Sequence, residues 1–203
     1  MDATTAAPTV AARSSPHPGV GFAEFVALVA GLMALNALSV DVMLPGLPAI
    51  DAAFAITADN DRQLVLSVYL VGFAAAQLVW GPLSDRFGRR PALTAGLGLY
   101  VVASVVAALA PSFEALLAAR LAQGLAAAST RVIALALVRD CYSGRAMGRV
   151  MSLVMMVFMA VPILAPSIGQ LVLLVAPWRW MFALLIVGGV AMLAWVLRRL
   201  PET

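Results

Sequence analysis

The chain has 203 residues, 63% of them hydrophobic and only 11% charged, with a net charge of +3 at pH 7. A soluble domain of this length needs far more polar surface, so the composition indicates an all-α integral membrane protein. The single cysteine, Cys141, excludes an internal disulfide framework, and the single histidine, His17, lies in the polar N-terminal segment. We therefore expect no metal site and no other cofactor. The basic residues lack the interleaved aromatic rings that would indicate a nucleic-acid partner.

Residues 1–21 are rich in alanine, threonine, serine and proline, and we expect them to form a disordered cytoplasmic tail. The first apolar run, residues 22–40, fits a transmembrane helix. A cleaved signal peptide is the alternative, but the run is too long and begins too late for one. The external loop that follows, residues 41–62, contains Pro45 and Pro48. We expect these to end the helix, because proline lacks the amide donor.

Six apolar runs are long enough to cross a hydrocarbon core of about 30 Å at roughly 1.5 Å per residue. They predict a transmembrane bundle over residues 22–200, with helices at residues 22–40, 64–81, 91–110, 115–138, 150–175 and 180–197. On this assignment nine of the 13 arginines fall in cytoplasmic segments, two in external ones and two within the fourth helix. Arginine-rich short loops stay in the cytoplasm, so both termini are predicted to be cytoplasmic.

The most polar break between two apolar runs extends from Gly81 to Arg90, between the second and third predicted helices. Eight residues here match the signature G-x-L-x-D-R-x-G-R-[KR]-x-x-L: Gly81, Leu83, Asp85, Arg86, Gly88, Arg89, Arg90 and Leu93. The region resembles the loop between helices two and three of the major facilitator superfamily. The resemblance implies the N-terminal six-helix half of a twelve-helix transporter, with residues 201–203 beginning its middle loop. It also implies a conformational latch, in which the aspartate contacts a helix N-terminus of the second half; the latch residues are Gly81, Asp85, Arg86, Gly88, Arg89 and Arg90.

The fourth predicted helix carries Arg120, Gln123 and Gly124 on one face, and Arg131, eleven residues on, lies on nearly the same face. A buried arginine costs about 2.5–3.5 kcal/mol in the bilayer, so such residues normally face protein or water. Either the two arginines line a polar cavity, which we favour for Arg120, or they extend to opposite interfaces. Both interpretations are open for Arg131. The residues Arg120-x-x-Gln123-Gly124 also resemble the R-x-x-Q-G signature of the family's proton-coupled members, where the arginine is tied to proton transfer.

Asp41 ends the first predicted helix at a depth similar to that of Arg120, so the two side chains could pair. Burial and a neighbouring arginine would then act on its proton affinity in opposite directions, as a proton switch requires. The alternative is a hydrated loop aspartate. The stretch Asp41-x-x-Leu44-Pro45-x-Leu47-Pro48 resembles the end of helix 1 in drug:proton antiporters of the bicyclomycin/chloramphenicol-resistance type. Glu24 is a second carboxyl candidate, more simply explained as marking the membrane interface.

The fifth predicted helix contains two prolines, Pro162 and Pro166, which should kink it. The small residues Ala165 and Gly169 allow a neighbouring helix to approach closely. This stretch resembles the antiporter signature G-P-x-x-G-G, with Ala165 in place of the first glycine and Gln170 in place of the last.

Several polar residues within the spans are candidates for lining a substrate cavity. They are Asn36, Tyr69, Gln77, Gln123 and Arg131. The uncharged ones are equally well explained by hydrogen bonds between helices.

The expected function is proton-coupled export of small drug-like molecules by alternating access, in an inner membrane of bacterial type. Alternating access needs two bundles, so we expect the missing C-terminal half, or a second copy of the chain, as partner. The alternative is a non-transporting half-size membrane protein or a truncated, inactive product. An intramembrane enzyme is disfavoured, because the spans carry no Ser–His pair, carboxylate dyad or cysteine nucleophile.

Overall fold

The computed structural model describes residues 20–56 and 60–200, and this part is built of helices without a strand. The elements are α1 (Phe22–Asp41), η1 (Leu44–Gly46), α2 (Leu47–Phe54), η2 (Asp61–Gln63), α3 (Leu64–Phe87), α4 (Arg89–Ala108), α5 (Phe113–Cys141), α6 (Gly144–Val175) and α7 (Arg179–Arg199). Six of the described helical stretches are long and apolar enough to cross a membrane, with α1 and α2 counted as one stretch. The predicted tail, apart from Val20 and Gly21, and residues 201–203 lie outside the described residues.

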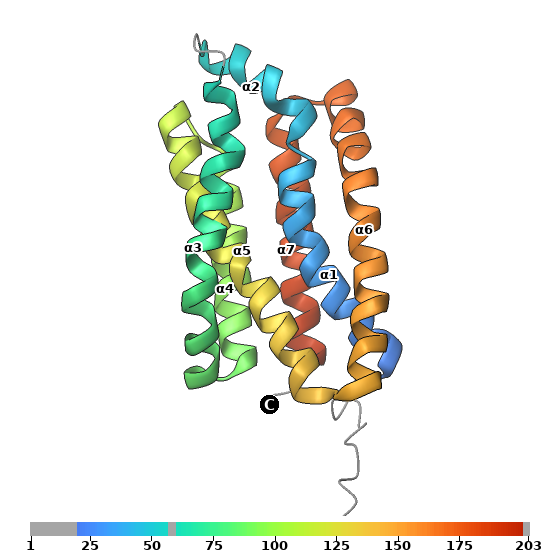
Figure 1. Ribbon diagram of the computed structural model, residues 1–203. Coiled ribbons are helices and arrows are strands. Elements are labelled where there is room, and N and C mark those ends of the chain that lie inside the picture. The colour runs from blue at the N-terminus through green and yellow to red at the C-terminus, as the bar shows by residue number, and fades with distance from the viewer. Residues whose placement is uncertain (1–19, 57–59, 201–203) are drawn as a thin grey trace, which may run out of the picture.

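The long helices form two groups, α3 with α4 and α5 on one side and α1 with α6 and α7 on the other (Figure 1). Helix α5 runs obliquely between the groups and packs against α3, α4 and α1, whereas α6 packs mainly against α1. The short helix α2 lies across one end of the bundle (Figure 1). The beginning of α1 and the end of α7 both lie at the opposite end, which we call the inner end. Its location in the cytoplasm stays a prediction.

The segment from Gly81 to Arg90 is not the loop that we expected. Helix α3 continues through Pro82 to Phe87, and Gly88 alone separates it from α4. Gly88 has φ 95°, in the left-handed region that favours glycine. The leucine and arginines of this segment are good helix formers, which explains why one glycine makes the whole reversal.

Two other predicted loops are also partly helical. Helix α5 extends to Cys141 and α6 begins at Gly144, so only two residues separate them. Helix α1 ends at Asp41, one residue beyond the predicted residue 40, and in the expected external loop Pro48 lies in the first turn of α2 rather than ending a helix. Proline suits this position, because the first-turn amide has no partner within the helix.

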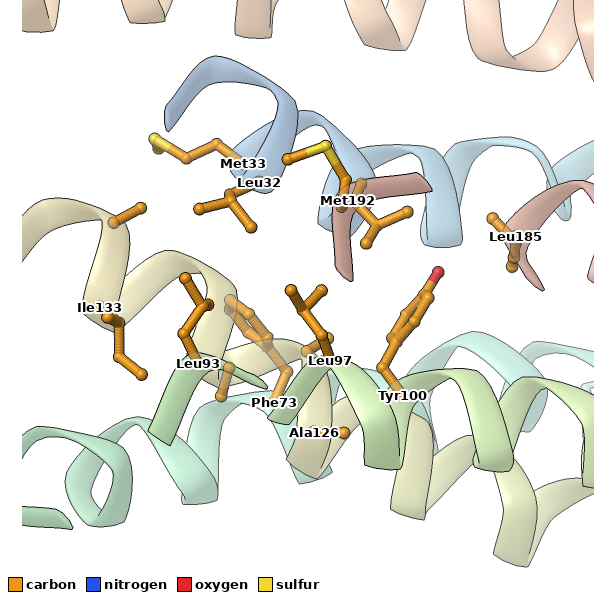
Figure 2. Packing of buried hydrophobic residues seen from close by; sticks show 14 of the residues in the cluster. Leu32, Met33, Phe73, Leu93, Leu97, Tyr100, Ala126, Ile133, Leu185 and Met192 are labelled. Atoms are coloured by element: carbon orange, nitrogen blue, oxygen red, sulfur yellow. The ribbon is translucent and has the colours of Figure 1, made fainter. Parts of the chain in front are cut away.

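The core lies where the two groups of helices meet. Figure 2 shows Leu32 of α1 and Met192 of α7 facing Leu93 and Leu97 of α4 across this boundary. Helices α3 and α5 come into backbone contact at Gly124, where an added Cβ would collide with the carbonyl group of Tyr69. Such small residues let membrane helices pack closely. This contact sets the distance between α5 and the aromatic residues of α3.

Candidate functional site

The centre of the candidate site is Arg120, whose side chain is fully buried in the middle of the bundle. Its Nε donates to the carbonyl oxygen of Val65 on α3 at 3.1 Å, and its Nη2 donates to the carbonyl oxygen of Ser39 on α1 at 3.1 Å. Its Nη1 donates to Oε1 of Gln123, one turn along α5, at 2.7 Å. The guanidinium therefore joins α1, α3 and α5 through neutral acceptors.

Aromatic rings complete the surroundings of this charge. The Arg120 Cζ lies 4.4 Å from the ring centroid of Tyr69 and 5.9 Å from that of Phe182 on α7. The negative face of an aromatic ring attracts a cation, most strongly where water is excluded. Within residues 20–56 and 60–200, no carboxylate forms a salt bridge with Arg120. The site thus holds a buried positive charge that polar and π contacts stabilise, with no counter-ion from the described part of the chain.

The predicted pairing of Asp41 with Arg120 is wrong. Asp41 is partly exposed at the last position of α1, and the α1 group that contacts Arg120 is the carbonyl of Ser39. Positions two apart on a helix point about 200° away from each other. The partly exposed Asp41 side chain therefore lies on a different face of α1 from the buried Ser39 side chain.

Sequence reasoning missed three hydroxyl residues of this cluster: Ser39, Tyr100 and Ser104. Gln123 Nε2 donates to Ser104 Oγ on α4 at 2.7 Å, and the hydroxyls of Ser39 and Tyr100 lie 2.6 Å apart. All three side chains are fully buried. The sequence does place hydroxyl residues in the first and third spans at about the depth of Arg120. Which hydroxyls contact the Arg120 cluster depends on how the helices pack, and the sequence does not show this.

The candidate cavity residues divide into two groups. Tyr69 donates to Asn36 Oδ1 at 2.9 Å, beside the Arg120 guanidinium, and Gln123 belongs to the same cluster. Arg131 is exposed, three turns further along α5, and Gln77 is partly buried two turns along α3 from Tyr69. The structure therefore brings Asn36, Tyr69 and Gln123 together, and leaves Gln77 and Arg131 outside the cluster.

A separate cavity of about 330 Å³ lies between α1, α6 and α7. Its lining is apolar and includes Leu35, Leu38, Leu164, Ala165, Ile168 and Met192. Only Ala165 among the predicted site residues contributes to it. This cavity can accommodate an apolar group, but none of the polar candidates faces it.

The antiporter-like stretch of α6 packs against the residues that follow Asp41. An added Cβ at Gly169 would collide with the carbonyl of Val42 and lie 2.8 Å from Cγ of Pro45. Ala165 is also buried, while Pro162 is exposed and Pro166 partly buried. Helix α6 continues through both prolines. The small residues therefore hold α6 close to the end of α1.

The predicted latch residues form a second arginine cluster at the inner end. Arg89 contacts Asp85 at 2.5 Å, Asp140 of α5 at 3.0 Å and Ser84 Oγ at 2.6 Å. Arg90 donates to the carbonyl of Leu197 on α7 at 2.8 Å. These contacts join the α3–α4 reversal to α5 and α7. Gly81 and Arg86 lie on the last turns of α3, next to this cluster.

Glu24 joins the two ends of the chain's helical part. Its carboxylate accepts from Nε and Nη2 of Arg199 at 2.6 and 2.7 Å, and Trp195 Nε1 lies 3.4 Å from Oε1. The contact holds the beginning of α1 against the end of α7.

Six apolar spans around a buried polar cluster define a multi-pass helical membrane protein. The family model of the Major Facilitator Superfamily matches residues 29–203, and the chain belongs to this superfamily. In bacteria such proteins lie in the inner membrane. The multidrug resistance proteins MdtL of Escherichia coli O81 (strain ED1a) and Shigella dysenteriae serotype 1 (strain Sd197) are each 38% identical to it over 172 residues. The match covers 85% of this chain but 44% of either relative, so the chain spans less than half of their length.

Two solved structures have the same helix arrangement. The D-xylose-proton symporter superposes with a TM-score of 0.76 at 17% identity, over 90% of this chain and 49% of that one. The human organic anion transporter MFSD10 (TETRAN) superposes with a TM-score of 0.65 at 23% identity, over 88% and 47%. At these identities the likeness shows the fold alone. The match extends over about half of each transporter.

Proposed function

We propose that this chain supplies the N-terminal half of a proton-coupled exporter of small drug-like molecules that works by alternating access. The observation that carries the proposal is the fully buried Arg120, whose charge is held by three neutral acceptors. A charge in the membrane interior is costly and is retained mainly where it has a function. The likeness to multidrug resistance proteins supports drug-like molecules as the substrate class.

Asp41 is the proposed proton carrier, and Arg120 is the fixed charge that responds to it. The Ser39 carbonyl that Arg120 binds lies two residues before Asp41 on α1. Protonation of Asp41 changes the net charge close to a buried guanidinium, where charge–charge interactions are strong because water is excluded. The contact between Arg120 and α1 therefore depends on the protonation state of Asp41, which links proton uptake to a movement of α1.

Alternating access needs a second bundle, and α3 and α6 are among the helices that expose large apolar side chains. Helix α6 exposes Ile163 (74%) and Leu174 (75%), and α3 exposes Leu78 (82%). We propose that the C-terminal half of the transporter, or a second copy of the chain, packs against these faces. The latch residues at the inner end, on the proposed cytoplasmic side, would then contact this second bundle, since Asp85 remains 64% exposed while it pairs with Arg89.

The proposal is tested with the native polypeptide reconstituted in liposomes, with ethidium as the probe and a trapped pH dye as the reporter. Ethidium addition should release protons from the wild type. Asp41→Asn should abolish the release, because an amide cannot carry the proton, and Arg120→Ala should abolish it, because the responding charge is gone. Asp61→Asn, at the first position of η2, and Arg139→Ala, at the exposed end of α5, are the matched controls and should behave as wild type.

Normal release from both Asp41→Asn and Arg120→Ala would remove these residues from the mechanism. Absence of release from the wild type would contradict proton-coupled export of this cation and favour the non-transporting alternative. Arg120→Lys distinguishes charge from geometry, because lysine keeps the charge but cannot span three acceptors.

A further inference from the structure

We propose that Tyr100 is a positioning residue for proton coupling, whose hydroxyl anchors the end of α1 so that the Ser39 carbonyl stays on Arg120. This role rests on the proposed function of Asp41 and Arg120. Tyr100 lies on α4, in none of the sequence signatures, and its side chain is fully buried. Figure 2 shows its hydroxyl pointing away from α4 towards α1.

The direction of each hydrogen bond around Ser39 follows from counting protons. Ser39 Oγ donates to the carbonyl of Leu35 at 2.7 Å, which uses its only proton. The Tyr100 hydroxyl, 2.6 Å away, must therefore donate to Ser39 Oγ. Ser39 is thus held twice, with Tyr100 bound to its side chain and Arg120 to its carbonyl.

The Ser39 carbonyl is available to Arg120 because α1 ends irregularly. In a continuing α-helix the Met43 amide would donate to Ser39. Here the Met43 amide donates to the carbonyl of Val40 at 3.3 Å instead, and the Val42 amide donates to Leu38 at 3.1 Å. Arg120 therefore binds a carbonyl that the tightened helix end has released, and the geometry of this end decides whether the bond exists.

The ring of Tyr100 packs against α7 at Gly189. An added Cβ at Gly189 would lie 3.0 and 3.1 Å from two ring carbons, so a glycine there makes room for the ring. Without the hydroxyl donor, Ser39 Oγ would lose its contact to α4, and only Arg120 would link this residue to another span. We infer that the end of α1, with Asp41 two residues on, would become more mobile relative to α5.

The titratable and charged groups around this anchor are few. Helix α1 contributes Asp41, α3 contributes Tyr69 and α5 contributes Arg120, while α7 contributes the uncharged ring of Phe182. The Tyr100 hydroxyl donates its proton within the cluster and does not need to ionise for the proposed role. Any effect of removing the Tyr100 hydroxyl would therefore come from a changed position of α1 and not from a lost titratable group. The test accordingly needs a measurement on Arg120 itself.

The test compares Tyr100→Phe with Tyr142→Phe in the native polypeptide in liposomes. Tyr142 is a matched control, because it is also buried and its hydroxyl has no hydrogen-bond partner among the described residues. Solid-state NMR of ¹⁵N-labelled arginine gives separate Nη1 and Nη2 signals when the guanidinium cannot rotate. The Arg120 signals are identified as those that disappear in Arg120→Lys.

We expect separate Arg120 signals in the wild type and in Tyr142→Phe, and merged signals in Tyr100→Phe and in Ser39→Ala. Ethidium-driven proton release should fall about fivefold in Tyr100→Phe, as expected for the loss of one hydrogen bond. Separate Arg120 signals in Tyr100→Phe would overturn the positioning role, whatever the release. Separate wild-type signals that merge in Tyr100→Phe, found together with a wild type that releases no protons, would contradict the proposed function and leave the anchor supported. Merged signals in the wild type would overturn the anchor.

Discussion

Two arginine clusters lie at different depths of this bundle and use opposite chemistry. Arg120 is fully buried and bound by carbonyl and amide oxygens, with no carboxylate in its salt-bridge range among the described residues. Arg89, at the inner end, is 19% exposed and bound by Asp85 and Asp140. Both join three helices or helix ends, so joining helices does not by itself explain the difference.

The two arginine clusters differ in how strongly water and salt weaken their electrostatic interactions. An ion pair near water is screened by solvent and salt and contributes little to stability, so the inner cluster can break and re-form at small cost. A buried charge without a counter-ion keeps a long-range field, because the surrounding dielectric constant is low. This difference agrees with the proposed roles, a latch for the inner cluster and a response to the charge of Asp41 for the buried one.

The largest expected effect is on the helix contact that forms the buried cluster. Gly124→Ala should destabilise the protein by about 1–3 kcal/mol, because the new Cβ collides with the Tyr69 backbone and forces α3 and α5 apart. Thermal unfolding of the detergent-solubilised native polypeptide measures this. Gly98→Ala, on α4 with open space around its Cβ, is the matched control and should be neutral or slightly stabilising.

The next largest effect is a difference in stability between lysine variants of the two arginines, Arg120 and Arg89. Arg120→Lys should lower the free energy of unfolding by about 2 kcal/mol, because one ammonium cannot reach Val65, Ser39 and Gln123 together. Arg89→Lys should cost less than about 1 kcal/mol, because its partners are partly exposed. Equal losses in the two variants would remove the contrast between the clusters.

The smallest expected effect is a change with salt concentration in what each variant costs in free energy of unfolding. Asp140→Asn breaks the pair with Arg89 and should cost about 0.5–1 kcal/mol at low salt. This cost should shrink in 1 M NaCl, where the Debye length falls to about 3 Å. The cost of Arg120→Lys should not change with salt. A salt-sensitive Arg120→Lys would indicate that water reaches the buried cluster.

The six spans could be predicted from the sequence, because apolar runs of this length with few charges are typical of transmembrane helices. Their ends could not, since the segment from Gly81 to Phe87 combines turn-forming and helix-forming residues and the helix prevailed. Similarly, α6 begins six residues earlier than the predicted residue 150 because its polar first turns continue the helix.

The candidate site was predictable only within one helix. The contact between Arg120 and Gln123 follows from their spacing on α5. The contacts to Ser39 and Ser104 join residues far apart in the chain, and depth along a span does not tell which faces meet. The same limit explains the wrong pairing with Asp41. Helix packing, which Gly124 controls, supplies the missing information.

The most direct measurement of the central claim is infrared difference spectroscopy of the native polypeptide in liposomes on addition of ethidium. A protonated carboxyl group has a C=O stretching band that disappears when the proton leaves. We predict that this band is lost from the wild type and from Asp61→Asn, and that Asp41→Asn shows no such change. A band that is still lost in Asp41→Asn would contradict the account, because the proton would then leave from another group.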